Sequence, residues 1–333
     1  MTTDLFAAVR GIPAAVITGA VPPACRRPVD TLDGPRADGG DVLLPSPEWR
    51  PRAPARHLVP ALAALGRDPR PFRFELSARR AGAWSPWVAT ATVGDAAFAP
   101  LPAEADGLRV DVDVITTDRP IDAVRVRVRL RAAAAPADGA WLVTLSASET
   151  VTAAGREWAS GDRGGATALA VPALSQMDAA PDVRPRVCSP TSVAMVLGYW
   201  GVAATIDAVA ADLFHPGLDI YGVWPAAIQA AARRGIAGYL LRFPDWTSAA
   251  WCLARGLPIV ASVRYARGEL RGAAIDETPG HLIVLTGSAA DTVLVNDPAA
   301  PTARDVPRRY ALADIRRVWL ERAGVGYVLF RPA

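Results

Sequence analysis

Val187-Cys-Ser-Pro-Thr-Ser-Val-Ala-Met-Val-Leu-Gly-Tyr-Trp-Gly201 is the stretch of sequence on which the interpretation of the whole chain depends. Four of its apolar residues recur at i, i+3, i+4 and i+7, the spacing of an amphipathic helix packed on a core: Val193, Val196, Leu197 and Trp200. Pro190 suits the first turn of this helix, and Gly201 suits its end. We therefore expect Cys188 at or just before the helix N-terminus, where free N–H groups and the helix dipole stabilise a thiolate, the nucleophilic form of cysteine.

The composition is that of an ordinary folded protein. With 333 residues, 51% of them hydrophobic, the chain is long enough to bury the cores of two domains. Its 36 Lys and Arg residues nearly balance 33 Asp and Glu residues, so the net charge indicates no nucleic-acid partner. Three cysteines, Cys25, Cys188 and Cys252, do not resemble the disulfide framework of a small secreted domain.

The beginning of the chain lacks the pattern of a signal peptide. Its most apolar run, from Ile12 to Pro22, is broken by Pro13 and Gly19 and has no basic leader. The small residues before Cys25 are a poor match to a lipidation site. No window approaches the roughly 20 apolar residues of a membrane-spanning helix, so we expect a cytoplasmic protein with no membrane span.

The first half of the chain reads as an all-β domain. Apolar and polar residues alternate from Phe72 to Ser77, and strand patterns follow near residues 109–114, 124–131 and 141–146, whereas residues 1–70 suggest short strands and long loops. This pattern predicts an antiparallel β-sandwich over residues 1–155. We expect Trp84 and Trp87 in its core. A row of arginines is expected on a solvated face, near the surface acids Asp111 and Asp113: Arg125, Arg127, Arg129 and Arg131.

Glycine-rich residues 156–169 are predicted to be a linker, and residues 170–333 an α+β domain. Helical patterns cover residues 206–214, 224–234, 245–255 and 310–319. Strand patterns cover residues 238–242, 257–265, 281–287, 293–296 and 326–330. The order of these segments places helices first and an antiparallel sheet afterwards.

The second half also holds candidates for every part of a thiol hydrolase site. Cys188 is the expected nucleophile, and His281, at the start of a strongly apolar strand, is the expected base. Asp297 follows the next strand on a returning hairpin and is expected to orient the histidine, with Asn296 as the alternative. The Gln176 side chain can donate an amide N–H to an oxyanion, beside the backbone N–H of Cys188.

The remaining polar candidates have simpler interpretations. We expect His57 in a loop, His215 against the carbonyl groups at the end of the preceding helix, and Cys252 in the core. No paired His or Cys residues stand at ligand spacing, so we expect no metal and no other cofactor.

Several blocks resemble the papain-like cysteine peptidases related to the bacteriocin-processing, double-glycine-leader peptidases: Ser175-Gln176, Cys188 to Gly201, Gly280-His-Leu-Ile-Val-Leu-Thr-Gly287, Val295-Asn-Asp-Pro298 and Val325-Gly-Tyr-Val328. Over residues 170–333 the resemblance implies a papain-like fold with Cys188 as nucleophile, His281 as base, Asp297 as orienting group and Gln176 in the oxyanion hole. The first half, with Trp84-Ser-Pro-Trp87, is similar to the N-terminal region of standalone bacterial members.

The chain departs from the leader-processing members because it has neither membrane helices nor a nucleotide-binding loop, so a role in bacteriocin export is not expected. The resulting hypothesis is a cysteine peptidase or amidase whose partner is a peptide or protein substrate. Two alternatives stay open at this point. One is a peptidase-fold binding protein without turnover, and the other is an acyltransferase with transglutaminase-like chemistry.

Overall fold

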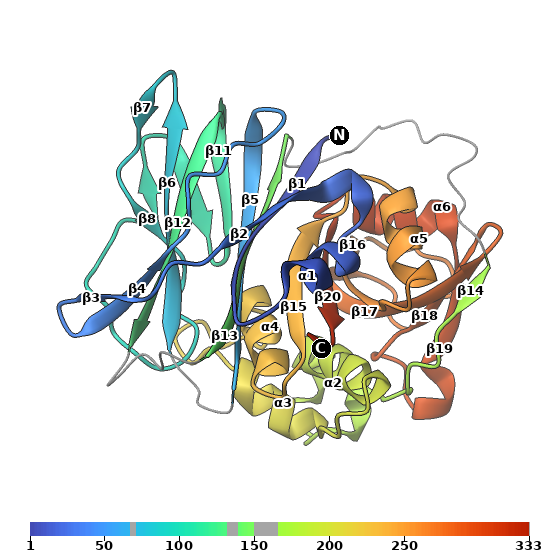
Figure 1. The fold of residues 1–333 in the computed structure, drawn as a ribbon. Coiled ribbons are helices and arrows are strands. Elements are labelled where there is room, and N and C mark those ends of the chain that lie inside the picture. The colour runs from blue at the N-terminus through green and yellow to red at the C-terminus, as the bar shows by residue number, and fades with distance from the viewer. Residues whose placement is uncertain (67–70, 132–138, 150–165, 333) are drawn as a thin grey trace.

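The computed structural model describes residues 1–66, 71–131, 139–149 and 166–332 (Figure 1). The predicted linker at 156–169 lies mostly outside these residues. Within them, no helix is both long and apolar enough to cross a membrane.

The first half of the described chain forms two neighbouring sheets (Figure 1). The seven-stranded sheet has the order β2-β1-β13-β5-β11-β10-β9, and the six-stranded sheet has the order β3-β4-β12-β6-β7, with β8 beside β6. The strands are β1 (Thr3–Arg10), β2 (Arg26–Thr31), β3 (Arg36–Asp38), β4 (Asp41–Pro45), β5 (Ala55–Leu65), β6 (Phe72–Arg80), β7 (Ala83–Trp84), β8 (Val88–Ala89), β9 (Glu104–Ala105), β10 (Leu108–Asp111), β11 (Val114–Ile121), β12 (Ala123–Arg131) and β13 (Ala140–Ser148). A short helix, α1 (Ala14–Ala20), and a 3₁₀ turn, η1 (Pro23–Cys25), lie between β1 and β2.

Strands β6 and β12 show how alternation builds the six-stranded sheet. Val128 lies opposite Phe74 and Val126 opposite Leu76, and all four side chains are buried. The residues between these apolar ones are charged and lie on the other face of the sheet, as period-two alternation predicts. They bond to one another and do not only face water. Glu75 is fully buried, and its carboxylate accepts hydrogen bonds from the Nε atoms of three arginines at 2.5–3.0 Å: Arg73, Arg127 and Arg129.

The arginine row of β12 therefore differs from its prediction. Its neighbouring acids are not Asp111 and Asp113 but acids of other segments: Asp38, Asp41, Glu48 and Glu75. Asp113 is itself buried, so it is not a surface acid.

The two tryptophans are likewise placed differently from the prediction. Trp84 and Trp87 are half-buried rather than in the core. The guanidinium of Arg125 lies 3.9 Å from the ring centre of Trp84, and that of Arg127 lies 4.1 Å from the ring centre of Trp87. The indoles therefore cover arginine side chains on the outer face of the sheet, which is a cation–π arrangement.

Residues 1–70 contain long strands, which the sequence prediction missed. Strand β5 has 11 residues, and His57 lies within it and is buried rather than in a loop. The predicted strand at residues 109–114 is correct only in part. Residues 109–111 belong to β10 and Val114 begins β11, but the chain turns between them, at Val112, whose φ is 56°, and Asp113.

The second half forms one antiparallel sheet with helices packed against it (Figure 1). Its sheet has the order β15-β20-β16-β17-β18-β19, with β14 beside β17. The strands are β14 (Thr167–Ala168), β15 (Ala237–Arg242), β16 (Ile259–Tyr265), β17 (Thr278–Ala289), β18 (Thr292–Asn296), β19 (Pro307–Ala311) and β20 (Val325–Phe330). The helices are α2 (Cys188–Tyr199), α3 (Ile206–Leu213), α4 (Trp224–Ala232), α5 (Trp246–Ala254) and α6 (Leu312–Ile315). Single turns are η2 (Gln176–Asp178), η3 (Arg184–Arg186), η4 (Ala303–Asp305) and η5 (Arg316–Leu320).

Helix α2 begins and ends close to where the sequence predicts. Its first residue is Cys188, and Gly201, with a φ of 76°, adopts the left-handed conformation typical of a helix stop. The helix is not amphipathic, however, because Ser189 to Leu197 are all buried. It lies inside the fold, so its polar residues face other protein groups and not water.

Two further predictions in this half are corrected. Tyr310 lies on β19 and is not the start of a helix, which begins two residues later at Leu312. His215 does not contact the carbonyls of α3; its Nδ1 accepts a hydrogen bond from the Leu218 N–H at 3.1 Å. Cys252 is fully buried in α5, as predicted.

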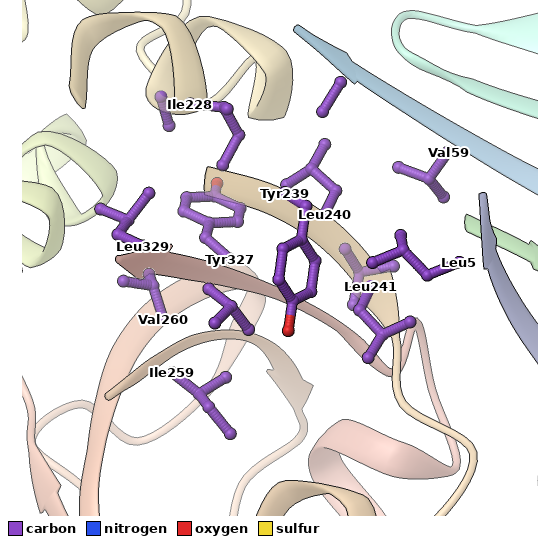
Figure 2. Close-up of a cluster of buried hydrophobic side chains, with 14 of the residues drawn as sticks. Leu5, Val59, Ile228, Tyr239, Leu240, Leu241, Ile259, Val260, Tyr327 and Leu329 are labelled. Atoms are coloured by element: carbon purple, nitrogen blue, oxygen red, sulfur yellow. The ribbon is translucent and has the colours of Figure 1, made fainter. Parts of the chain in front are cut away.

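The two halves share one continuous buried cluster. Figure 2 shows Leu5 and Val59 of the seven-stranded sheet beside Leu240 and Leu241 of β15. Polar contacts also join the halves: the Gln229 side chain pairs with both backbone groups of Ala64 at 3.0 and 3.2 Å. The division into two separate domains at residues 1–155 and 170–333 stays a prediction.

Candidate active site

Cys188 is the first residue of α2, and it is only partly buried. No side chain caps this end of the helix. The N–H groups of the first turn are therefore left for the thiol or for a ligand, as expected at a helix N-terminus. Cys188 lines a cavity of about 950 Å³, so its sulfur is accessible.

His281 is held rigidly on the central strand β17. It lies opposite Val263 of β16, and only 3% of its surface is exposed. Its Nε2 lies 2.8 Å from Oδ1 of Asp297. The ring is also hydrogen-bonded to the Cys188 thiol, which leaves Nδ1 as the nitrogen that faces the sulfur.

Asp297 follows β18, whose hairpin with β17 returns it to His281 as the sequence analysis expects. Its Oδ2 accepts a hydrogen bond from the Tyr310 hydroxyl at 2.7 Å, and its Oδ1 accepts one from the Ala299 N–H at 3.1 Å. Asn296 points elsewhere, because its amide donates to the carbonyls of Val171 and Pro172. Of the two alternatives, Asp297 is therefore the one in contact with the histidine.

These contacts shift the pKa values of the three residues in complementary directions. Burial alone would raise the pKa of Cys188, but the hydrogen bond and charge of His281 and the N–H groups of Leu282 and Ser189 outweigh it and lower that pKa. Burial would lower the pKa of His281, but Asp297 and Cys188 raise it above the usual range. Burial opposes ionisation of Asp297 as well, yet His281 and Tyr310 lower its pKa. The arrangement favours a thiolate beside an imidazolium.

Gln176 does not itself line this cavity. Its Nε2 donates to the Arg184 carbonyl at 2.8 Å, in the turn that leads to Cys188, and its backbone N–H donates to the Pro298 carbonyl at 2.8 Å. The side chain is buried, and it is not one of the residues that line the cavity. One amide hydrogen of Gln176 is thus committed to Arg184, which leaves the second as the only one available to another acceptor.

Two tyrosines beside the site were not found from the sequence. Tyr310 contacts Asp297, and the Tyr327 hydroxyl lies 3.3 Å from Oγ of Ser189, the residue that follows Cys188. The only signal available is general: a buried tyrosine hydroxyl needs a hydrogen-bond partner. Which partner it finds depends on the register of strands that are distant in the sequence.

The cavity is bounded by both halves of the chain. One side is formed by Cys188, by residues 220–224 and by strands β16 and β17. The other side is formed by residues of β5, β10 and β11, which belong to the seven-stranded sheet. In the part of the chain that the structure describes, no group of three His, Cys, Asp or Glu side chains is arranged to hold a metal ion.

Comparison with known proteins agrees with this architecture. The model of a family described as "Peptidase_C39 like family" matches residues 168–327. This part of the chain is similar to the C39-like peptidase family. The match begins just before Gln176 and contains Cys188, His281 and Asp297. No curated protein matches the sequence.

Two solved structures are similar to the C39-like half. One is a double glycine motif protease from an AMS/PCAT transporter in complex with the leader peptide, with 17% identity, 50% of this chain and 94% of that chain covered, and a TM-score of 0.33. The other is the peptidase domain of Streptococcus ComA, a bifunctional ABC transporter involved in quorum sensing, with 16% identity, 48% and 98% covered, and a TM-score of 0.34. Both scores are low, so we draw nothing further from these two likenesses.

Proposed function

We propose that this protein is a cysteine peptidase that cleaves a peptide or related amide bond with Cys188 as nucleophile, His281 as base and Asp297 as the group that orients His281. The observation that carries the proposal is the continuous contact from thiol to imidazole to carboxylate, with 2.8 Å between Nε2 of His281 and Oδ1 of Asp297. The match of residues 168–327 to the C39-like peptidase family supports the same reaction class.

In the proposed reaction, the Cys188 thiolate attacks the carbonyl carbon of the scissile bond. The backbone N–H of Cys188, at the uncapped start of α2, would stabilise the oxyanion. The second amide hydrogen of Gln176, whose first is held by the Arg184 carbonyl, is the candidate for the other donor. The His281 imidazolium then donates its proton to the leaving amine, and a thioester remains on Cys188. A water molecule, deprotonated by the now neutral His281, hydrolyses the thioester and restores the thiolate.

Hydrolysis of a pool of quenched fluorescent peptides tests this proposal. We expect Cys188→Ser and His281→Ala to reduce kcat by on the order of 10⁴ to 10⁶, because the nucleophile and its base act as one unit. Cys252→Ala is the matched control, since Cys252 is buried in α5 and outside the cavity; it should keep its activity. Equal hydrolysis by the wild type and Cys188→Ser would contradict the proposal.

The same assay separates the other candidate reactions. An acyltransferase would pass the acyl group from the thioester to an added primary alkylamine and form an amide, with the Cys188 thiol as leaving group and little free acid formed. A binding protein without turnover would retain peptides and cleave none of them.

A further inference from the structure

The wall of the cavity that faces Cys188 from the seven-stranded sheet has a definite polarity. Arg109 of β10 lies opposite Thr116 of β11, and Thr116 lies opposite His57 of β5. Asp111 lies opposite Val114. Directly opposed residues project from the same side of a sheet, so these side chains form one face, and all of them line the cavity.

This wall is fixed against the C39-like half and does not simply lie near it. The turn between β10 and β11 carries Asp113, whose Oδ2 accepts a hydrogen bond from the Trp224 N–H at 2.6 Å. Trp224 is the first residue of α4 and also lines the cavity. The contact therefore sets the distance between β10 and the side of the cavity that holds Cys188.

Positive charge predominates around the cavity. Its lining includes one carboxylate, that of Asp111, and four guanidinium groups: Arg109, Arg186, Arg264 and Arg322. Two of these cations are already neutralised, because Arg186 pairs with Asp219 at 2.7 Å and Arg322 pairs with Glu269 at 2.9 Å.

The other two cations, Arg109 and Arg264, are not neutralised in this way. Within the described chain, neither Arg109 nor Arg264 has a carboxylate within ion-pair distance. Arg264 also borders a neighbouring hollow that contains Glu269 and Glu277. Arg109 lines the cavity of Cys188 from the opposite wall, with Asp111 beside it on the same strand and Glu104 of β9 directly opposite it in the sheet but beyond ion-pair distance.

We propose that the seven-stranded sheet is one wall of the substrate-binding cleft and that Arg109 is a specificity residue on it, which binds a carboxylate of an acidic peptide substrate. The proposal rests on the proposed function for Cys188. A guanidinium is suited to this task because it holds a carboxylate with two parallel hydrogen bonds. The N-terminal sheet thereby acquires a role in choosing the substrate.

Alkylation of Cys188 tests the charge of this wall without a known substrate. The rate constant for iodoacetate, an anion, is divided by that for iodoacetamide, which is neutral. We expect Arg109→Gln to lower this ratio roughly two- to fivefold at low salt, because it removes a positive charge that faces the sulfur across the cavity. The matched control is Arg119→Gln, on the exposed end of β11 and outside the cavity, which should leave the ratio unchanged. An unchanged ratio in Arg109→Gln would overturn the proposal.

Cleavage of three peptide pools, acidic, neutral and basic around a common set of central residues, tests the specificity itself. We expect the wild type to cleave the acidic pool with the highest kcat/KM, and Arg109→Gln to lose this preference while Arg119→Gln keeps it. Preference for the basic or neutral pool would refute the assignment. If no pool is cleaved but the iodoacetate ratio still falls in Arg109→Gln, the proposed peptidase function fails and the anion-binding wall stands.

Discussion

At the scale of single residues, the three cysteines show how environment sets reactivity. Cys188 at the start of α2 has a lowered pKa, mainly because His281 offsets its burial. Burial raises the pKa of Cys25 to about 12, and it raises that of Cys252 as well. Cys188 is predictable from the sequence because Pro190 and Gly201 mark the two ends of its helix, and helix ends are encoded locally.

Selective alkylation of Cys188 is the first prediction at this scale. Near pH 6, iodoacetamide should label Cys188 far faster than Cys25 or Cys252, because only Cys188 has a lowered pKa and an accessible sulfur. His281→Ala should remove most of this advantage, because it removes the group that lowers the pKa. Peptide mapping by mass spectrometry measures the three rates. Uniform labelling of all three cysteines would count against the ion pair.

The second residue-scale prediction concerns Tyr310, whose hydroxyl donates to Asp297 at 2.7 Å. In Tyr310→Phe the carboxylate loses one donor, so the pKa of Asp297 rises, that of His281 falls, and that of Cys188 rises. Alkylation of Cys188 near pH 6 should slow by about tenfold, since hydrogen bonds to charged groups contribute about 1.5–3 kcal/mol. The acidic limb of the pH profile should move to higher pH. Tyr199→Phe is the control, because it loses a single hydrogen bond to the Gly256 carbonyl outside the site and should leave the profile in place.

At the scale of elements, strands were predicted well where the pattern was continuous and poorly where it concealed a turn. Alternation at Val110, Val112 and Val114 suggested one strand, but the chain reverses there. Val112 adopts a φ of 56°, which is unfavourable for a β-branched residue, and no sequence rule would place it in a turn. Contacts beyond the hairpin hold this turn, among them the hydrogen bond that the Trp224 N–H donates to the Asp113 carboxylate.

The prediction at this scale concerns Asp113 and the pH dependence of stability. Burial raises its pKa from 3.8 to about 7, so the folded state binds a proton more tightly than the unfolded state. Its contribution to stability is therefore full below about pH 4 and is lost as the pH rises towards 7.

Asp113→Asn should flatten this part of the pH dependence, because the amide oxygen can still accept from Trp224 but carries no charge. Asp113→Ala should cost about 1 kcal/mol at low pH, because the Trp224 N–H at the start of α4 loses its acceptor. Urea unfolding at several pH values measures both effects. A pH dependence identical to that of the wild type in Asp113→Asn would show that Asp113 does not titrate in this range.

At the scale of the whole molecule, the change from β-rich to helix-rich patterns indicates two regions, but the patterns do not show how the regions meet. Strands β1, β5 and β13 of the seven-stranded sheet read as apolar on at least one face, but nothing in the sequence states that Leu5 and Val59 pack on β15. The cavity also depends on how the two halves meet. Cys188 and His281 were predictable from local patterns, whereas Arg109 lies across the cavity from them only because the two halves pack together.

The shared core predicts that the described chain unfolds as one unit. Leu5 and Val59 of the first half and Leu240 and Leu241 of the second are all buried, so unfolding either half would expose apolar surface of the other, at about 25 cal/mol per Å². Buried thiols can report the two halves separately: Cys252 in α5, and a cysteine introduced by Val126→Cys inside the first half. In increasing urea, both should become reactive to a thiol reagent at the same concentration, and Leu240→Ala should shift both midpoints downward together. Exposure of the β12 thiol at a lower urea concentration than Cys252 would instead show two domains that unfold separately, as the sequence pattern suggested.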